Sequence, residues 1–257
     1  MRIASWNVNS LKVRLPQVLD WMQAHAPDVL GLQETKLVDE TFPVDAFREL
    51  GYEARFNGQP TYNGVALLSR APQSEPIVDL PGLDDPQRRI LGATIDGIRI
   101  INLYVPNGQA VGTDKYAYKL DWLEKLRAWL AAEIERNPRC VVMGDFNIAP
   151  DDRDVHDPEE WAGKVLCSEP ERAALQTILE LGFVDTFRLF EQPEGVYSWW
   201  DYRAAGFRRN RGLRIDLVLA SRALAPGCTH SGVDIEPRRN ERPSDHAPVV
   251  AVFDTSR

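Results

Sequence analysis

Val29-Leu30-Gly31-Leu32-Gln33-Glu34 is a short apolar run that ends in two polar residues. Pro27-Asp28, a pair typical of turns, precedes the run, and Thr35-Lys36 follows it. An apolar run of about four to eight residues between such signals is typical of a strand buried on both faces. The stretch therefore predicts a buried strand that presents Gln33 and Glu34 at its carboxyl end.

Similar apolar runs recur along the chain. They predict strands over residues 2–8, 29–32, 64–69, 90–95, 98–105, 140–144, 215–220 and 248–253. Helical apolar spacing predicts helices over residues 14–24, 116–136 and 171–181, the last of them closed by Gly182. Strands outnumber helices, and several lie at hairpin-like spacing. This pattern favours a mixed sheet sandwich flanked by helices over a doubly wound parallel sheet.

Length and composition are those of an ordinary globular protein. The 257 residues are 44% hydrophobic and 26% charged, which suits one large domain over residues 1–257. No apolar run of about eighteen residues occurs, and the chain starts directly with a predicted strand, so we expect neither a membrane span nor a signal peptide. We therefore expect a cytoplasmic, monomeric protein.

Cysteine spacing and charge distribution restrict the function further. Cys140, Cys167 and Cys228 lie far apart and form no metal-binding spacing, so we expect free thiols. The formal net charge of −8 argues against a protein that coats nucleic acid without specificity. Two groups of arginines nevertheless stand towards the C-terminal end, and their members are Arg208, Arg209, Arg211, Arg214, Arg238, Arg239 and Arg242. A phosphate-binding surface and a solvated loop both remain open for them.

Six polar groups of residues stand next to the predicted strands. Each alone is a weak signal, because Asp or Asn after a strand is usually a turn former. The groups are Trp6-Asn7-Val8-Asn9, Gln33-Glu34-Thr35-Lys36, Asn102-Leu103-Tyr104-Val105-Pro106-Asn107, Gly144-Asp145-Phe146-Asn147, Arg214-Ile215-Asp216 and Ser244-Asp245-His246-Ala247-Pro248. Together they predict one polar rim above a β core.

Some residue types on this rim suit a Mg²⁺ ion. Mg²⁺ takes oxygen ligands, and Glu34, Asp245 and the carboxamide of Asn7 offer them. Zinc is disfavoured, because no Cys/His ligand set stands in the sequence.

Other rim residues suit the hydrolysis of a phosphate ester, which needs charge screening and an in-line water. Asp145 and Asn147, two residues apart on one side of a strand end, are placed to orient that water. Asp216 is suited to hold His246 in one tautomer and to stabilise its charged form.

Eight stretches form a longer ordered pattern that covers almost the whole chain. They are Trp6-Asn7-Val8-Asn9-Ser10-Leu11, Leu32-Gln33-Glu34-Thr35-Lys36, Gly64-Val65-Ala66-Leu67-Leu68-Ser69, Asp85-Pro86-Gln87-Arg88-Arg89, Gly144-Asp145-Phe146-Asn147-Ile148-Ala149-Pro150, Ser198-Trp199-Trp200-Asp201-Tyr202-Arg203, Arg211-Gly212-Leu213-Arg214-Ile215-Asp216 and Pro243-Ser244-Asp245-His246-Ala247-Pro248. This set resembles exonuclease III and its relatives in the endonuclease/exonuclease/phosphatase superfamily. The resemblance implies a four-layer α/β sandwich of the DNase I type, with two mixed sheets face to face, helices outside and a site along one sheet edge.

The resemblance also implies a metal site and a catalytic set. The residues expected at or beside the metal, with Glu34 as the principal ligand, are Asn7, Glu34, Asp145, Asn147, Asp245 and His246. The residues expected to act on the scissile phosphate and the attacking water are Tyr104, Asp145, Asn147, Asp216 and His246. Within that set, Asp216 and His246 would form a carboxylate–imidazole pair.

A third implied set contacts DNA, and its members are Arg88, Trp199, Leu213, Arg208, Arg209 and Arg211. Trp199 and Leu213 match positions that line a pocket for the sugar at a lesion or frayed end. The implied activity is that of a Mg²⁺-dependent DNA repair nuclease, with Mn²⁺ as a substitute metal. It would act as a 3′→5′ exonuclease, an abasic-site endonuclease and a 3′-end-cleaning enzyme on duplexes with abasic sites, nicks or recessed 3′ ends.

The loop over residues 151–169 departs from the family pattern beside the expected site. Leu166 is larger than the small residue that a roomy sugar pocket would prefer. We therefore expect 3′→5′ exonuclease activity, whereas efficient abasic-site incision and the ranking of the two activities stay open. Two alternatives stay open, namely another phosphoesterase of the same superfamily and a noncatalytic nucleic-acid-binding relative. The aromatic and arginine residues between Ser198 and Asp216 argue against the first, and the filled catalytic positions argue against the second.

Overall fold

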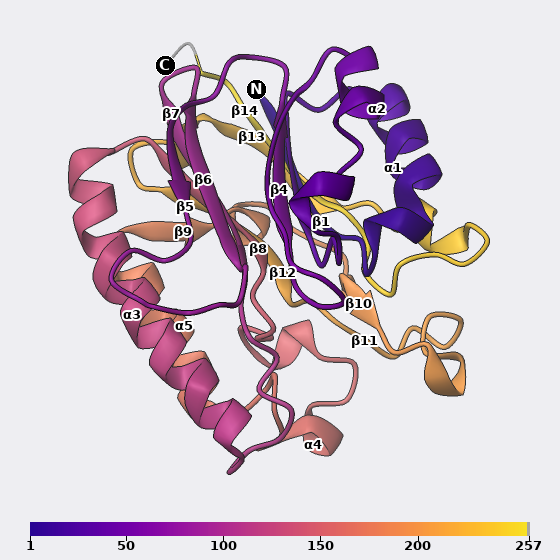
Figure 1. The fold of residues 1–257 in the computed structure, drawn as a ribbon. Helices are drawn as coiled ribbons and strands as arrows, with labels where there is room; N and C mark the ends of the chain where they lie inside the picture. Colours follow the sequence, from indigo (N-terminus) through magenta and orange to yellow (C-terminus); the bar gives the residue numbers. More distant parts are fainter. Residues whose placement is uncertain (256–257) are drawn as a thin grey trace.

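The structure, a computed structural model, describes residues 1–255 and contains two six-stranded sheets packed face to face (Figure 1). The first sheet has the order β13 (Cys228–Val233), β14 (Val249–Phe253), β1 (Arg2–Asn7), β2 (Val29–Gln33), β4 (Val65–Ser69) and β3 (Glu53–Asn57). The second has the order β5 (Ser74–Val78), β6 (Ile90–Ile95), β7 (Ile98–Tyr104), β8 (Cys140–Asp145), β12 (Asp216–Ser221) and β9 (Phe183–Asp185). Both sheets are mixed. In the first, β1 pairs with β2 in parallel and with β14 antiparallel. In the second, β8 pairs with β7 in parallel and with β12 antiparallel.

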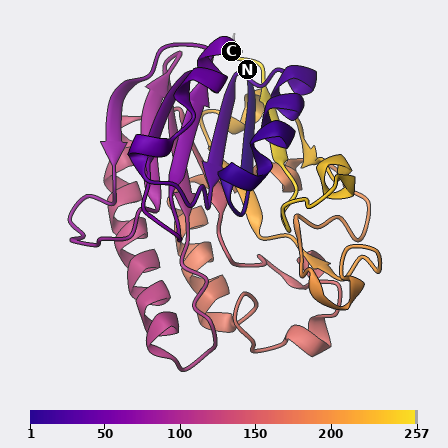
Figure 2. The same ribbon diagram turned by 45° about the vertical axis from the view of Figure 1, so that its right-hand side comes forward.

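Helices cover the two outer faces of the sheets, so that the chain forms four layers (Figure 1, Figure 2). The first sheet is covered by α1 (Leu11–His25) and α2 (Val44–Glu49). The second is covered by α3 (Asp114–Arg136) and α5 (Glu169–Glu180). The predicted four-layer α/β sandwich is therefore confirmed.

Shorter elements gather at the end of the sandwich that lies away from the two termini (Figure 1). They are α4 (Pro158–Trp161), β10 (Trp199–Trp200) and β11 (Gly212–Leu213), the last two paired antiparallel. The 3-10 helices of the described residues are η1 (Asp39–Thr41), η2 (Asp152–Asp154), η3 (Thr186–Leu189), η4 (Arg203–Ala205), η5 (Ala225–Gly227) and η6 (Glu236–Arg239). No helix between residues 1 and 255 is long and apolar enough to cross a membrane.

The predicted elements are present, with bounds that differ by a few residues at most. Helix α1 begins at Leu11, three residues before the predicted start, and α5 begins at Glu169, behind a capping box formed by Ser168 and Glu171. Gly182 follows the end of α5 with a φ of 114°, a left-handed conformation that closes the helix as expected. The three cysteines are free thiols, as predicted.

Four longer strands were not predicted, and they are β3, β5, β9 and β13. Each of them lies at an edge of its sheet. An edge strand has one hydrogen-bonded neighbour and a more exposed surface, so its apolar pattern is weak. In β5, for example, every residue except Ile77 is exposed.

The interior between the sheets contains a buried polar network. Gln33 Nε2 donates to Asn102 Oδ1 at 2.6 Å and to Ser5 Oγ at 2.9 Å. Asn102 Nδ2 donates in turn to the carbonyls of Leu32 at 2.9 Å and Ala66 at 2.8 Å, across the sheet interface. Asn102, predicted on the polar rim, is therefore a core residue, because it lies in the middle of β7 and its amide satisfies strand carbonyls of the other sheet.

The close approach of the sheets depends on Gly31. A Cβ atom at this position would lie 2.7 Å from Asn102 Oδ1 and 2.7 Å from Met143 Cε. We expect Gly31→Ala to lower the free energy of unfolding by about 1–3 kcal/mol, because an overpacked interface must shift. Urea unfolding followed by far-UV circular dichroism measures this change. Gly232→Ala in edge strand β13 is the matched control, since its Cβ would first meet His230 Nε2 at 3.5 Å, and an equal loss in both variants would contradict the prediction.

Candidate active site

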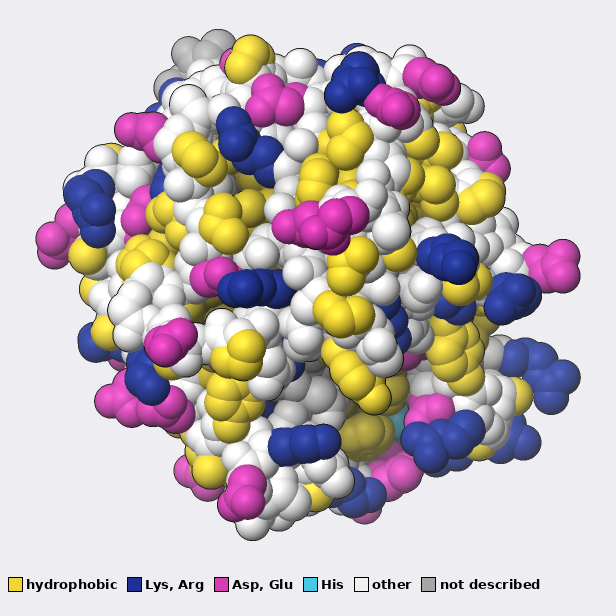
Figure 3. Space-filling model, in the orientation of Figure 1, with side chains coloured by type: hydrophobic (Ala, Val, Ile, Leu, Met, Phe, Trp, Pro, Cys, Tyr) yellow, Lys and Arg dark blue, Asp and Glu magenta, His cyan; other side chains and the backbone are white. Residues whose placement is uncertain are grey.

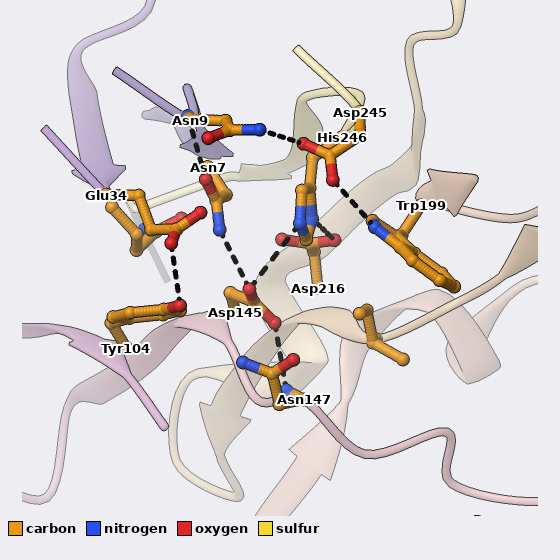
Figure 4. A network of polar contacts seen from close by, with 12 residues as sticks. Asn7, Asn9, Glu34, Tyr104, Asp145, Asn147, Trp199, Asp216, Asp245 and His246 are labelled. Carbon is orange, nitrogen blue, oxygen red and sulfur yellow. Dashed lines mark hydrogen bonds and ion pairs between the residues drawn. The ribbon is translucent and has the colours of Figure 1, made fainter. Parts of the chain in front are cut away.

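The predicted polar rim exists, and it is formed by strand ends of both sheets (Figure 4). Asn7 is the last residue of β1, Tyr104 the last of β7 and Asp145 the last of β8. Asp216 is the first residue of β12, which runs antiparallel to β8, so it lies at the same end of the sheet. The rim thus runs along one edge of the sandwich that is formed by the ends of central strands.

Two buried carboxylates and one imidazole form the centre of the site. Asp216 and Asp145 are direct partners in the register of β12 and β8. The imidazole of His246 lies between them, with Nδ1 2.8 Å from Asp216 Oδ2 and Nε2 3.7 Å from Asp145 Oδ2. Asn7 Nδ2 donates to Asp145 Oδ2 at 2.9 Å, and Ser198 Oγ donates to Asp216 Oδ2 at 2.7 Å. The predicted pairing of Asp216 with His246 is therefore present.

Burial and charge set the protonation of this group. Burial raises the pKa of Asp145 to about 7, although the positive charge of His246 opposes the rise. Burial alone would lower the pKa of His246, but the carboxylates of Asp216 and Asp145 outweigh it and raise that pKa to about 10. His246 therefore carries a positive charge at neutral pH.

Glu34 and Tyr104 stand on the other side of the rim (Figure 4). The Tyr104 hydroxyl donates to Glu34 Oε1 at 2.9 Å, and Lys36 Nζ lies 3.9 Å from the same oxygen. Burial first, and then the negative charge of Glu34, raise the pKa of Tyr104 well above its usual value, so the hydroxyl stays protonated. Glu34 has a φ of 51°, an uncommon left-handed conformation for a non-glycine residue, and its side chain is 20% exposed. The carboxylate is therefore partly exposed and faces Tyr104 just after the end of β2.

Asp245 belongs to a third group of contacts, which includes Asn9, a residue of the predicted rim for which the sequence predicted no role. Asn9 Nδ2 donates to Asp245 Oδ1 at 2.9 Å, and Trp199 Nε1 donates to Asp245 Oδ2 at 3.0 Å. Asn9 Oδ1 accepts a hydrogen bond from Lys36 Nζ at 2.6 Å, and its backbone N–H donates to Asn7 Oδ1 at 3.0 Å. Asn9 thus contacts the metal-ligand candidates Asn7 and Asp245 directly, and it contacts Lys36 of the Glu34 segment. The spacing of two residues from Asn7 was the available signal.

Asn147 reaches the site by a different route from the one predicted. It lies after β8 with a φ of 48°, so it does not share a strand face with Asp145. Its backbone N–H donates to Asp145 Oδ1 at 2.9 Å, and its Nδ2 donates to the Val105 carbonyl at 2.9 Å. Its Oδ1 accepts a hydrogen bond from Asn107 Nδ2 at 3.2 Å. A tight turn, and not the period of a strand, brings the two side chains together.

The donor atoms on the rim fit a hard cation. Glu34, Asn7 and Asp245 offer oxygen, which suits Mg²⁺ and related ions. Among the described residues, the group of ionisable ligand types with closely spaced atoms is Asp145, Asp216 and His246, whose ligand atoms lie within 4.8 Å of one another. Both ring nitrogens of His246 face carboxylates, and a charged imidazole has no lone pair for a metal ion. The metal-ligand role expected for His246 stays a prediction, and its contacts also suit a charge-balancing role between the two carboxylates.

The three residues expected around the sugar pocket lie together. Leu213 and Leu166 are buried in one apolar cluster, against which Trp199 packs. Trp199 pairs with Leu213 between β10 and β11, and its ring meets that of Trp161 edge to face at 6.4 Å. Leu166 has a φ of 75°, a left-handed conformation that is strained for a leucine. The loop of residues 151–169 thus forms one wall of this cluster.

The arginines separate into different environments. Arg214 is buried between Asp154 and Asp185, at 2.7 Å from each, so it belongs to the interior and not to the positive surface predicted for its cluster. Arg211 pairs with Glu160 at 2.9 Å, and Arg88 pairs with Asp79 at 2.6 Å. Arg208 and Arg209 are exposed.

On the face drawn in Figure 3, blue Lys and Arg side chains gather at the lower right, over the β10–β11 segment. Beside them a histidine and apolar side chains lie in a hollow. The positive surface therefore borders a recess at the site end of the molecule.

Comparison with known proteins identifies the family. A family model described as the endonuclease/exonuclease/phosphatase family matches residues 4–246, so the chain belongs to this family. The exodeoxyribonuclease III of Haemophilus influenzae is 37% identical over 98% of this chain and 100% of that protein.

Solved structures with the same fold include a 3′-5′ exonuclease from Neisseria meningitidis, at 47% identity and a TM-score of 0.97, covering 99% of this chain and 100% of that one. An AP endonuclease from Archaeoglobus fulgidus has 41% identity and a TM-score of 0.95, with 99% of each chain covered. The predicted class, a metal-dependent DNA repair nuclease of the exonuclease III type with a DNase I-like fold, is confirmed.

The charge on His246 depends on Asp216, and this dependence is testable. We expect Asp216→Asn to lower the pKa of His246 by about 1–3 pH units, because a neutral amide replaces the adjacent carboxylate. With only 4 histidines in the chain, NMR titration of the imidazole resonances measures it. Asp234→Asn is the control, since Asp234 lies 3.4 Å from His25 and should leave His246 unchanged. An unaltered His246 titration in Asp216→Asn would contradict the assignment.

Proposed function

We propose that the chain is a Mg²⁺-dependent enzyme of duplex DNA that removes nucleotides and blocking groups from 3′ ends, at nicks and recessed termini, and incises abasic sites less efficiently. The observation that carries the proposal is the buried Asp216–His246–Asp145 chain, which stands opposite Glu34 and Tyr104 and next to an apolar cluster. We assign one catalytic domain to residues 1–257, acting as a monomer.

The proposed Mg²⁺ ligands are Glu34, Asn7 and Asp245, which lie on neighbouring segments of the first sheet. Asn9 holds the side chains of Asp245 and, through its backbone, of Asn7, so it sets the direction of both oxygens. When bound, Mg²⁺ supplies positive charge that screens the phosphate and stabilises the departing oxygen. Glu34 is a partly exposed carboxylate of the site, and we assign it as the principal ligand on the resemblance to the family.

Asp145 is the proposed acceptor of the proton from the attacking water. A carboxylate buried at the end of β8, with its pKa raised to about 7, is matched to proton transfer near neutral pH. Asn7 and the backbone of Asn147 fix its two oxygens. The Asn147 side chain, held by Asn107, stands beside it for hydrogen bonding to the water or the phosphate.

His246 and Tyr104 are the proposed groups that stabilise charge on the phosphate. His246 is positive and preorganised by Asp216, so it does not need to reorient as negative charge develops. The Tyr104 hydroxyl stands on the opposite side and donates its proton to Glu34 in this structure. We assign it to donate to the phosphate once Glu34 turns to the metal. Trp199 and Leu213 then form the apolar wall for the terminal sugar.

Leu166 is the proposed reason for a preference for 3′ ends over abasic sites. Its side chain is 4% exposed and packs in the cluster that contains Leu213, next to Trp199. A flipped-out abasic sugar needs space against such walls, whereas a frayed terminal nucleotide approaches from the end of the duplex.

Arg208 and Arg209 are proposed to contact backbone phosphates. Arg211 and Arg88 are proposed to join them once DNA phosphates displace their carboxylate partners.

A side-by-side assay tests the proposed function. One duplex carries a recessed 3′ end and the other an abasic-site analogue, and single-turnover rates are compared with Mg²⁺, with Mn²⁺ and with EDTA. We expect metal-dependent product on both, with the higher rate on the recessed end. A protein that binds DNA and cleaves neither duplex would overturn the proposal in favour of a noncatalytic role.

Removal of the Glu34 carboxylate should weaken the metal site. We expect Glu34→Ala to raise the Mg²⁺ concentration for half-maximal rate by at least about 10-fold, because mainly weaker ligands then hold a strongly hydrated cation. Titration of Mg²⁺ in the recessed-end assay measures the change, and excess Mg²⁺ should partly restore the rate. Asp45→Ala is the control, since Asp45 is an exposed carboxylate of α2. An unchanged titration curve for Glu34→Ala would remove Glu34 as the principal ligand.

Shortening Leu166 should change substrate preference. Leu166→Gly removes the side chain from the pocket wall and suits the left-handed φ of 75°. We expect the ratio of abasic-site incision to exonuclease rate to rise by about 10-fold, the scale of a small change in an apolar pocket. Leu166→Met keeps the bulk and should keep the ratio, so the pair of variants separates volume from chemistry. A folded Leu166→Gly protein with the wild-type ratio would exclude Leu166 as the gate.

A further inference from the structure

A buried ion pair lies behind the site and takes no part in the chemistry proposed above. Lys119 of α3 and Glu171 of α5 contact each other through Nζ and Oε1, and both side chains are 0% exposed. An ion pair withdrawn from water adds little to stability, because the loss of hydration offsets the attraction. The specific contacts of the two groups therefore indicate what the pair does.

Lys119 holds the two segments that carry Asn107 and Asn147. Its ammonium group donates to the Asn147 carbonyl at 2.6 Å and to the Asn107 carbonyl at 3.1 Å. With Glu171 as the third acceptor, all three N–H groups are used. The side chains of Asn107 and Asn147 are bonded to each other at 3.2 Å, so Lys119 fixes from behind the pair that faces Asp145.

Glu171 holds the opposite wall of the site. Its Oε1 accepts the backbone N–H of Leu166 at 3.0 Å, and its Oε2 accepts the backbone N–H of Ser168 at 3.2 Å. The Leu166 carbonyl accepts the Ala149 N–H at 2.8 Å, which joins the Leu166 loop to the turn that follows Asn147. Leu166 and Asn147 both have left-handed backbones, with φ of 75° and 48°, and such conformations persist only where the surroundings impose them.

We propose that Lys119 and Glu171 are positioning residues that hold Asn147 and the Leu166 loop in one fixed relation, and thereby set both the rate of phosphodiester hydrolysis and the choice between 3′ ends and abasic sites. The proposal rests on the proposed function. Substrate preference then depends on the Lys119–Glu171 pair, which is buried and does not contact DNA. The ammonium group positions the catalytic turn, the carboxylate positions the pocket wall, and their contact couples the two.

The test compares three variants with a matched control. Lys119→Met leaves the carboxylate unpaired, Glu171→Gln removes one charge with little change in shape, and the double variant Lys119→Met/Glu171→Met replaces the pair by apolar groups. A buried pair replaced in this way commonly keeps the stability of the fold. The control is Arg99→Met, which breaks another buried ion pair of helix α3. In that pair, Arg99 Nε of β7 lies 2.8 Å from Glu133 Oε1 of α3.

Two readouts are measured on each folded protein. Single-turnover rates at saturating DNA are expected to fall by about 10- to 100-fold in Lys119→Met and in the double variant, the scale of a misplaced catalytic group. DNA affinity should stay unchanged, and the ratio of abasic-site incision to exonuclease rate should rise as the Leu166 wall loosens. Hydrogen exchange in residues 147–168 should become faster in the same variants and stay slow in Arg99→Met.

The outcomes separate this inference from the proposed function. A double variant with wild-type rates, ratio and exchange would overturn the inference, because the charges would then only neutralise each other. So would an equal effect in Arg99→Met, or a failure of both the double variant and Glu171→Gln to fold, since the pair would then serve the fold as a whole. A wild-type protein without nuclease activity would refute the proposed function, while faster exchange in Lys119→Met but not in Arg99→Met would still support the positioning of the two loops.

Discussion

The organisation of the site depends on two carboxylates that the strand register places side by side. Asp145 and Asp216 are paired by the register of β8 and β12, and both are about 1% exposed. Two buried negative charges at this spacing would repel strongly, so the site requires a cation between them. His246 supplies it, and its own carbonyl accepts a hydrogen bond from Trp6 Nε1 at 3.2 Å. The first strand, the middle of the chain and the segment before the last strand must therefore all be in place before the charges balance.

The sequence predicts the interior of this fold better than its borders. The central strands carry apolar residues on both faces, as in the stretch from Val29 to Gln33, and their ends are marked by polar residues. The four edge strands were missed because half of their surface is not buried in a sheet. Ser74–Val78, for example, contains a proline and two charged or polar residues, and only its pairing with β6 makes it a strand. Tertiary context, and not local preference, decides such segments.

The same limit applies to the site. Residues at strand ends, such as Asn7 and Asp145, could be predicted because their position follows from the strand pattern. The roles of Ser198 and Lys119 could not be predicted, because each acts through contacts with distant segments. Ser198 stands in a stretch that resembles the family, but the stretch does not indicate its contact with Asp216. Asn147 is a third case. The sequence placed it beside Asp145, but it reaches that position by a left-handed turn and not along one face of a strand. A single residue with a left-handed backbone after a strand reverses the direction of its side chain. Glycine is the residue type that indicates such a conformation reliably.

The negative net charge of the protein is compatible with a DNA substrate, because its exposed arginines are held only by weak pairs with carboxylates. Arg203, Arg211 and Arg239 are exposed or half-buried, yet each contacts a carboxylate, at 2.7, 2.9 and 3.3 Å respectively. Such pairs are worth little in water, so DNA phosphates can compete for the guanidinium groups at small cost. The acidic partner, once released, repels the same phosphates, which limits the net gain in affinity. Exposed guanidinium groups paired in this way would hold phosphates weakly at any one position, and such contacts carry no base information.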